Sequence, residues 1–265
     1  MNKKNVDVAQ FIEKNRSLIY GAILGDAYLP GAHGKSTHLV FGHGIPQKEY
    51  LFHKYELFKE ASYPPYFQKS DHGDSWRFHT VKSVEWQRVW SIFHQDSKKI
   101  IDFTGKSKIL MTFRREAVLD VLDDHGMALW WMDDGYLNFS WNKKTRQWKE
   151  TAKLATCGFP AEINQMILQW IEAKYGAKGY VTKQKVQKKN RFYEILEFNW
   201  QEFLKIAVRV KPYVIPSMFY KIDLAAMKIY HKKGILGPCK IKIDRESEEI
   251  EIPVTFGSGC GSYPA

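Results

Sequence analysis

The sequence predicts an α+β protein made of two similar halves, because two apolar helical segments end alike and are followed by similar elements. The first segment, residues 18–25, ends in Asp26-Ala-Tyr-Leu29, and the second, residues 125–132, ends in Asp133-Asp134-Gly-Tyr-Leu137. Apolar runs bounded by capping residues and turns are typical of buried helices. The order helix, strands, helix, strands, helix then follows twice, which indicates an internal duplication.

Each half contains helices and strands in corresponding places. In the first half we expect strands at 37–42, 66–69 and 76–80, with helices at 47–61, opened by Pro46, and at 84–94. In the second half we expect strands at 148–156, 180–186 and 192–198, with helices at 161–175, opened by Pro160, and at 200–210. The predicted organisation is an N-terminal extension (1–15), two repeats (16–120 and 121–235) and a C-terminal hairpin or tail (236–265).

The composition indicates a globular, basic protein. Hydrophobic residues make up 44% and charged residues 26% of 265 residues, and the formal net charge is +11. That excess favours a polyanionic partner, most often nucleic acid, although an anionic membrane surface attracts the same charge. No segment is long and apolar enough to span a bilayer, and the first fifteen residues lack the apolar run of a secretory signal. The chain is therefore expected in the cytoplasm, encoded by a bacterium or phage rather than an organelle.

Asp26 and Asp134 occupy positions that helix stability alone does not explain. The C-terminus of a helix carries about −0.5 charge, so a carboxylate there is unfavourable by a few tenths to ~1 kcal/mol. If the two helix ends meet, their carboxylates and nearby backbone carbonyls form a group of hard oxygen ligands that suits Mg²⁺. Gly21 and Gly25 allow another helix to approach closely. The three cysteines lack the spacing of a zinc site or of a disulfide framework.

These motifs resemble the two signature helices of the LAGLIDADG homing endonucleases, in the single-chain form with two copies. The resemblance spans residues 18–222 and includes the segments 97–101 and 211–222. It implies two αββαββα repeats, with paired signature helices and antiparallel sheets that lie in the DNA major groove. It also implies Mg²⁺ as the cofactor, with Mn²⁺ as a substitute.

The resemblance carries over to particular site residues. Asp26 and Asp134 match the family's metal-binding acids, and Gly25 would contribute as a further metal ligand. Asp133 remains a rival to Asp134, which we prefer because it aligns with Asp26 and directly precedes Gly135. Lys99 and Lys221 would lie at the rim of the site and stabilise the reacting phosphate or organise water.

Basic and polar residues in the expected strands are candidates for DNA contact. Residues 173–193 contain seven basic side chains and no acid, and residues 138–149 also lack acids. Lys183 and Lys185 share one face of a strand by the period of two. The candidates are His38, Gln68, Lys69 and Arg77 in the first half, and Lys143, Lys144, Arg146, Lys149, Lys153, Lys183, Lys185, Lys188, Lys189 and Arg191 in the second.

The predicted function is site-specific hydrolysis of both strands of a long asymmetric DNA target, leaving short 3′ overhangs, by a monomer. The expected partner is double-stranded DNA, with intron RNA as a second partner that the family allows. The alternative is an intron RNA maturase or a noncatalytic nucleic-acid-binding regulator on the same scaffold. Two carboxylates in positions that oppose the helix dipole favour the enzyme, since a protein that only binds has no use for them.

Overall fold

The structure is a computed structural model that describes residues 6–30, 36–71, 73–94, 99–101, 107–109, 111–142, 146–186 and 191–227. The chain divides into two compact units. The first contains Met1–Trp130 and Gly158–Ile163, and the second contains Trp131–Cys157 and Asn164–Ala265. Among the described residues, none of the helices combines the length and apolarity that crossing a membrane requires. The predicted C-terminal hairpin lies outside the described residues.

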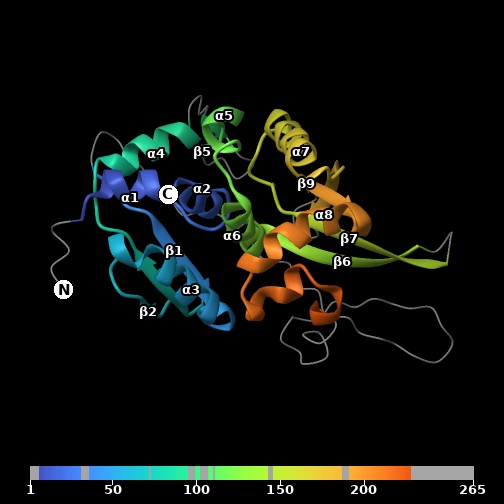
Figure 1. Cartoon of the computed structure of the whole chain (residues 1–265), viewed down its shortest axis with the longest axis horizontal. Helices are drawn as coiled ribbons and strands as arrows, with labels where there is room; N and C mark the ends of the chain where they lie inside the picture. The colour runs from blue at the N-terminus through green and yellow to red at the C-terminus, as the bar shows by residue number, and fades with distance from the viewer. Residues whose placement is uncertain are drawn as a thin grey trace. The chain divides into compact units, whose positions relative to one another are not determined.

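The first unit packs helices against a small antiparallel sheet. Its sheet has the order β1-β3-β2, and α3 contacts both β1 and β3 (Figure 1). A second antiparallel pair, β4 and β5, follows α4. The elements are α1 (Val8–Lys14), α2 (Arg16–Leu24), β1 (Val40–Gly44), η1 (Ile45–Gln47), α3 (Lys48–Phe58), η2 (Lys59–Ala61), β2 (Tyr66–Gln68), β3 (Ser75–His79), α4 (Glu85–Phe93), β4 (Lys99–Ile101), β5 (Ser107–Ile109) and α5 (Arg115–Val118).

Helix α6 (Asp124–Asp134) begins in the first unit and passes without a break into the second. The six residues from Met127 to Met132 are all buried. A helix that is apolar on every side is typical of a protein core, where packing replaces the usual polar face. Strand β6 starts immediately at Gly135, where an added Cβ would lie 2.4 Å from Trp131 Nε1. Glycine is therefore required for this direct change from helix to strand.

The second unit places helices on one face of a four-stranded antiparallel sheet. The strand order is β6-β7-β9-β8, and α8 packs on β7 and β9 (Figure 1). The Asn199 side chain caps α8 by accepting from the N–H of Glu202 at 2.9 Å. The elements are β6 (Gly135–Asn142), β7 (Gln147–Leu154), α7 (Ala161–Tyr175), β8 (Tyr180–Val186), β9 (Arg191–Asn199), α8 (Trp200–Val210), η3 (Lys211–Tyr213) and η4 (Pro216–Lys221).

The two sheets repeat one plan, and the predicted fold class is confirmed. In each, the strand before the long helix pairs with the strand before the last helix, which pairs with the strand between them. An isolated bridge between Tyr28 and Val40 stands where β6 pairs with β7 through Tyr136 and Lys153. Strand β6 was not among the strands expected from the residue patterns, although the αββαββα repeat implied by the resemblance includes it, and it adds a full strand to the second sheet.

Candidate metal centre and DNA interface

Two apolar helices of the first unit, α2 and the start of α6, pack backbone against backbone. A Cβ added at Gly21 would lie 2.0 Å from the carbonyl oxygen of Gly126, and one at Gly126 would lie 2.3 Å from Ser17 Oγ. Near the starts of the helices, Ser17 Oγ donates to Asp123 Oδ1 at 2.5 Å and accepts from the Asp123 N–H at 2.8 Å. This pair of hydrogen bonds holds the N-terminal ends of α2 and α6 together.

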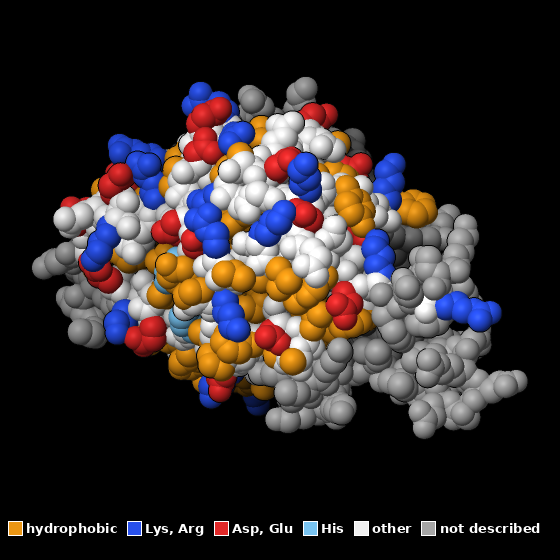
Figure 2. All heavy atoms as spheres, turned by 45° about the vertical axis from the view of Figure 1, so that its right-hand side comes forward, with side chains coloured by type: hydrophobic (Ala, Val, Ile, Leu, Met, Phe, Trp, Pro, Cys, Tyr) orange, Lys and Arg blue, Asp and Glu red, His pale blue; other side chains and the backbone are white. Residues whose placement is uncertain are grey.

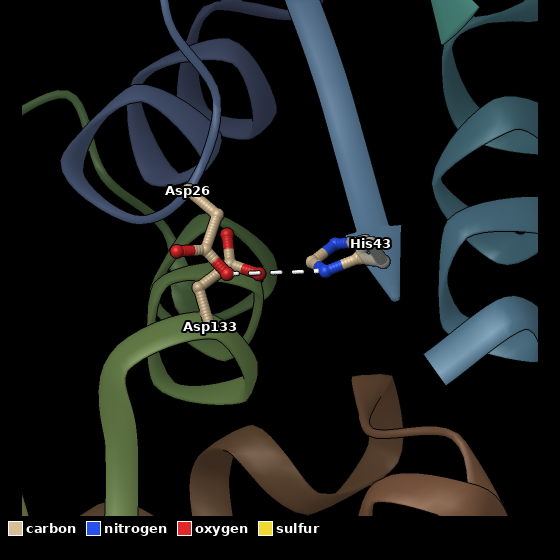
Figure 3. Close-up of side chains that lie close together, drawn as sticks. All are labelled: Asp26, His43 and Asp133. Atoms are coloured by element: carbon tan, nitrogen blue, oxygen red, sulfur yellow. Dashed lines mark ion pairs between the residues drawn. The ribbon is translucent and has the colours of Figure 1, made fainter. Parts of the chain in front are cut away.

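Asp26 lies just beyond the C-terminus of α2, where the N–H of Gly25 donates to the carbonyl of Gly21 at 3.2 Å. The Asp26 side chain is 34% exposed, so solvent and a ligand can reach it. Its Oδ2 lies 3.9 Å from Nδ1 of His43, a nearly buried residue of β1 (Figure 3). That distance is longer than a hydrogen bond, so space remains between the two groups.

His43 is held from behind by a buried lysine that sequence analysis did not single out. Lys54 of α3 is fully buried, and its Nζ lies 3.0 Å from His43 Nε2 and 4.4 Å from the centre of the Tyr50 ring. An ammonium group only donates hydrogen bonds, so Nε2 must accept, and the neutral imidazole then carries its proton on Nδ1. His43 therefore presents an N–H to the space beside Asp26.

Asp133, in the last turn of α6, completes a candidate metal centre. One ligand atom each from Asp26, His43 and Asp133 lies within 4.8 Å of the other two (Figure 3). Two carboxylates suit Mg²⁺ or Mn²⁺, which prefer oxygen ligands. His43 Nδ1 bears a proton in the tautomer set by Lys54, so His43 fits as a hydrogen-bond donor beside the cation and the two acids fit as its ligands.

The other predicted site residues lie in different surroundings. Asp134 is 9% exposed and does not belong to this group, and its backbone carbonyl accepts from the N–H of Ala155 at 3.0 Å. Lys221 is 5% exposed, and its Nζ donates to the backbone carbonyl of Asp133 at 2.6 Å. The side chain of Lys99, at the start of β4, lies outside the described residues.

One face of the first sheet carries Arg77 and Gln68, two of the DNA-binding candidates of the first half. Arg77 lies opposite Gly42 and Tyr66, and Gln68 lies opposite Ser75, on the face that alternates with the buried Phe78. His38 precedes β1, and the centre of its ring lies 5.1 Å from the centre of the His79 ring. Burial, together with the positive charges of His79 and Lys82, lowers the pKa of His38. Lys69 is exposed just after β2.

In the second sheet, the lysines proposed as DNA contacts do not all lie on one face. Lys149 and Lys153 lie on the face opposite that of the buried Leu154, whereas Lys183 pairs with Glu194 on the face of Leu154. Arg146 is exposed in the turn between β6 and β7. The remaining candidates, or their side chains, fall outside the described residues: Lys143, Lys144, Lys185, Lys188, Lys189 and Arg191.

The basic excess does not form a single field on the molecular face in Figure 2. Lysine and arginine side chains alternate there with aspartate and glutamate, and hydrophobic groups lie among them. Because separated charges are screened within about 10 Å at ordinary ionic strength, their local arrangement matters more than the total. The candidates for DNA contact are therefore the side chains on the strand faces described above.

Comparison with known proteins decides the family. The model of the LAGLIDADG DNA endonuclease family matches residues 16–205, which include α2 with the Asp26 that lies beyond it and α6 with its terminal Asp133 and Asp134. This chain belongs to that family. The resemblance seen in the sequence is thereby confirmed.

The relatives of this LAGLIDADG chain carry two kinds of name. A probable intron-encoded endonuclease 1 of Wickerhamomyces canadensis is 26% identical, with the alignment covering 77% of this chain and 81% of that protein. The cytochrome b mRNA maturase bI2 of Saccharomyces cerevisiae is 25% identical, with coverage of 78% and 46%. Among solved structures, the homing endonuclease I-WcaI bound to its DNA recognition sequence matches with a TM-score of 0.60 and 23% identity, covering 83% of this chain and 94% of that one.

Proposed function

We propose that this LAGLIDADG protein is a site-specific endonuclease that hydrolyses both strands of a long asymmetric DNA duplex and leaves short 3′ overhangs. The observation that carries the proposal is the gathering of Asp26 and Asp133 with His43 in a chain of this family. Two repeats in one chain supply two non-identical sheets, which suits an asymmetric target and a monomeric enzyme.

The chain's own residues would divide the catalytic work. A bound Mg²⁺ or Mn²⁺ supplies positive charge for the phosphate oxygens and makes a nearby water easier to deprotonate. Asp26 and Asp133 hold that cation, and the His43 Nδ1–H orients a carboxylate or water beside it. Lys221, being buried on the backbone of Asp133, acts as a positioning residue instead of touching the phosphate.

A second candidate function is assistance in splicing of intron RNA, because two mRNA maturases are among the relatives. Maturation needs RNA contacts but no carboxylate pair. The partly exposed Asp26 favours the nuclease, because an acidic group at the surface weakens simple binding of a polyanion. The 3.9 Å between Asp26 Oδ2 and His43 Nδ1 also leaves space between the two groups.

Selection from a randomised plasmid library tests the two functions directly. We expect double-strand breaks at a single family of long sites in Mg²⁺ or Mn²⁺, with none in EDTA. Cohesive-end sequencing of the products reports the overhang. Tight binding to structured RNA without cleavage of any library member would replace the endonuclease proposal by the maturase one.

Replacing Lys54 by methionine tests how His43 acts. The change keeps the volume but removes the donor, so the imidazole can carry its proton on Nε2 and turn the Nδ1 lone pair toward the acids. We expect cleavage in Mg²⁺ to fall about tenfold, as for the loss of a group that orients a site. The rate in Mn²⁺ should fall less, because imidazole is a better ligand for Mn²⁺ than for Mg²⁺.

The measurement is the ratio of cleavage rates in Mn²⁺ and Mg²⁺. Lys59→Met is the matched control, because Lys59 is an exposed lysine that pairs with Glu56 at 2.6 Å. A wild-type ratio in Lys54→Met would mean that Lys54 does not set the tautomer of His43.

A further inference from the structure

Four side chains form a row across the second sheet, one from each strand. Strand register places Tyr136 of β6 opposite Lys153 of β7, Lys153 opposite Glu197 of β9, and Glu197 opposite Tyr180 of β8. Residues directly opposite one another on antiparallel strands share a face and interact. The row therefore crosses the sheet on the face opposite the buried Leu154.

Glu197 is the centre of this row. Lys149 Nζ lies 3.1 Å from Glu197 Oε1, and Lys153 Nζ lies 3.2 Å from Oε2, so each carboxylate oxygen holds one ammonium group. The Tyr180 hydroxyl donates to Oε1 at 2.6 Å and accepts from Lys149 at 3.1 Å. We call this network the Glu197 cluster. It consists of Glu197, Lys149, Lys153 and Tyr180.

Glu197 is a buried anion that its neighbours keep ionised. The residue is 7% exposed, whereas the side chain of Lys149 is 49% exposed and that of Lys153 is 18% exposed. Burial alone would raise the pKa of Glu197, but the hydrogen bond from Tyr180 and the two lysines lower the pKa overall. The pKa of Lys149 is raised, chiefly by its hydrogen bond with Tyr180. Glu197 therefore stays ionised and covered while the lysines reach solvent.

A glutamate in this position opposes simple attraction of DNA. One negative charge beneath the face cancels part of the positive charge of two lysines and lowers non-specific affinity. The arrangement instead fixes the orientation of the lysine ammonium groups. A lysine held by a carboxylate and a hydroxyl loses most of its conformational freedom. Contacts from mobile lysines to phosphates carry no sequence information, whereas fixed donors can be matched to the acceptors of a base edge.

We propose that Glu197 is a specificity-determining residue that holds Lys149 and Lys153 in place to read acceptor atoms at one short stretch of the DNA target. Guanine presents two such acceptors, O6 and N7, in the major groove. Glu197 itself acts through the lysines and is a positioning residue. The inference rests on the proposed function insofar as the chain must bind duplex DNA.

The test compares Glu197→Gln with Glu194→Gln. Both changes remove one negative charge from β9, but Glu194 pairs with Lys183 on the other face of the sheet. Binding is measured in EDTA, at several salt concentrations, to the duplex selected by the wild-type protein, to its single-base variants and to a scrambled duplex of equal length. Circular dichroism confirms that each variant is folded.

We expect Glu197→Gln to bind the scrambled duplex more tightly and its preference for the selected duplex to fall at least tenfold. The freed lysines should pair with phosphates, and each one that does so should steepen the slope of log affinity against log salt by about one. Loss of discrimination should be confined to a few adjacent base pairs, and Glu194→Gln should keep the wild-type preference. If Glu197→Gln does not fold, Tyr180→Phe replaces it: this change removes the shortest hydrogen bond of the cluster but keeps the Glu197 charge and both ion pairs, so we expect a smaller loss of preference at the same base pairs and an unchanged salt slope.

Two outcomes separate the inference from the proposed function. If the wild-type protein prefers its selected duplex but both glutamate variants show the same preference and salt slope, the role of Glu197 is overturned and the endonuclease proposal stands. If the wild-type protein shows no preference for any duplex, the proposed function fails and the inference fails with it.

Discussion

Replacing Asp26 by asparagine is expected to lower DNA cleavage at least ~10³-fold, because it removes one of two carboxylates that would hold the cation. Asparagine keeps the shape of aspartate but not its charge, so fold and packing should persist. Affinity for the selected duplex in EDTA should stay equal or rise, since a negative charge near phosphates is lost. Cleavage time courses on that duplex, with binding measured in parallel, check the result.

The same substitution at Asp133 and at Asp134 tests which of these two aspartates holds the cation with Asp26. The motif alignment favours Asp134, whereas the carboxylate that lies with Asp26 and His43 is that of Asp133. We expect Asp133→Asn to match Asp26→Asn, and Asp134→Asn to keep more activity. A variant series in which only Asp134→Asn loses cleavage would contradict the proposed centre and restore the choice made from the motif.

Helices and their ends were the features that sequence could predict well. The apolar runs before Asp26 and Asp134 form α2 and α6, and the two long helices begin after Pro46 and Pro160 as expected. These features depend on local composition and on capping chemistry, which a sequence displays directly. Strand β6 alternates Leu137, Phe139 and Trp141 with polar residues, but it changes directly from a helix without the turn residues that usually mark a strand.

The support of the candidate site could not be predicted, because it depends on packing between elements. His43 and Lys54 lie on a strand and a helix, eleven residues apart, and meet only because α3 packs on β1. In the sequence, the histidine resembles an ordinary core residue and the lysine resembles one from a solvent-facing helix surface. The Glu197 cluster likewise depends on strand register, which the basic composition of neighbouring segments does not reveal.

The second large effect is expected from Gly21→Ala, which should destabilise the first unit although alanine is the better helix former. Intrinsic propensity favours alanine over glycine inside a helix by about 1 kcal/mol. The added Cβ, however, would lie 2.0 Å from the backbone oxygen of Gly126, and backbone cannot turn aside as a side chain can. Forcing atoms into a packed core costs typically ~1–3 kcal/mol, and a clash with backbone lies at or above the upper end.

Urea denaturation of Gly21→Ala should therefore give a net loss of about 2 kcal/mol or more in the free energy of unfolding. Gly158→Ala is the control, because no atom lies within 4 Å of a Cβ added there, and its stability should stay within ~0.5 kcal/mol of wild type. A Gly21→Ala protein as stable as wild type would show that α2 and α6 do not approach this closely. Because Asp26 lies just beyond the end of α2, separating the helices should also lower cleavage in Gly21→Ala below the wild-type rate at temperatures where the variant is still folded.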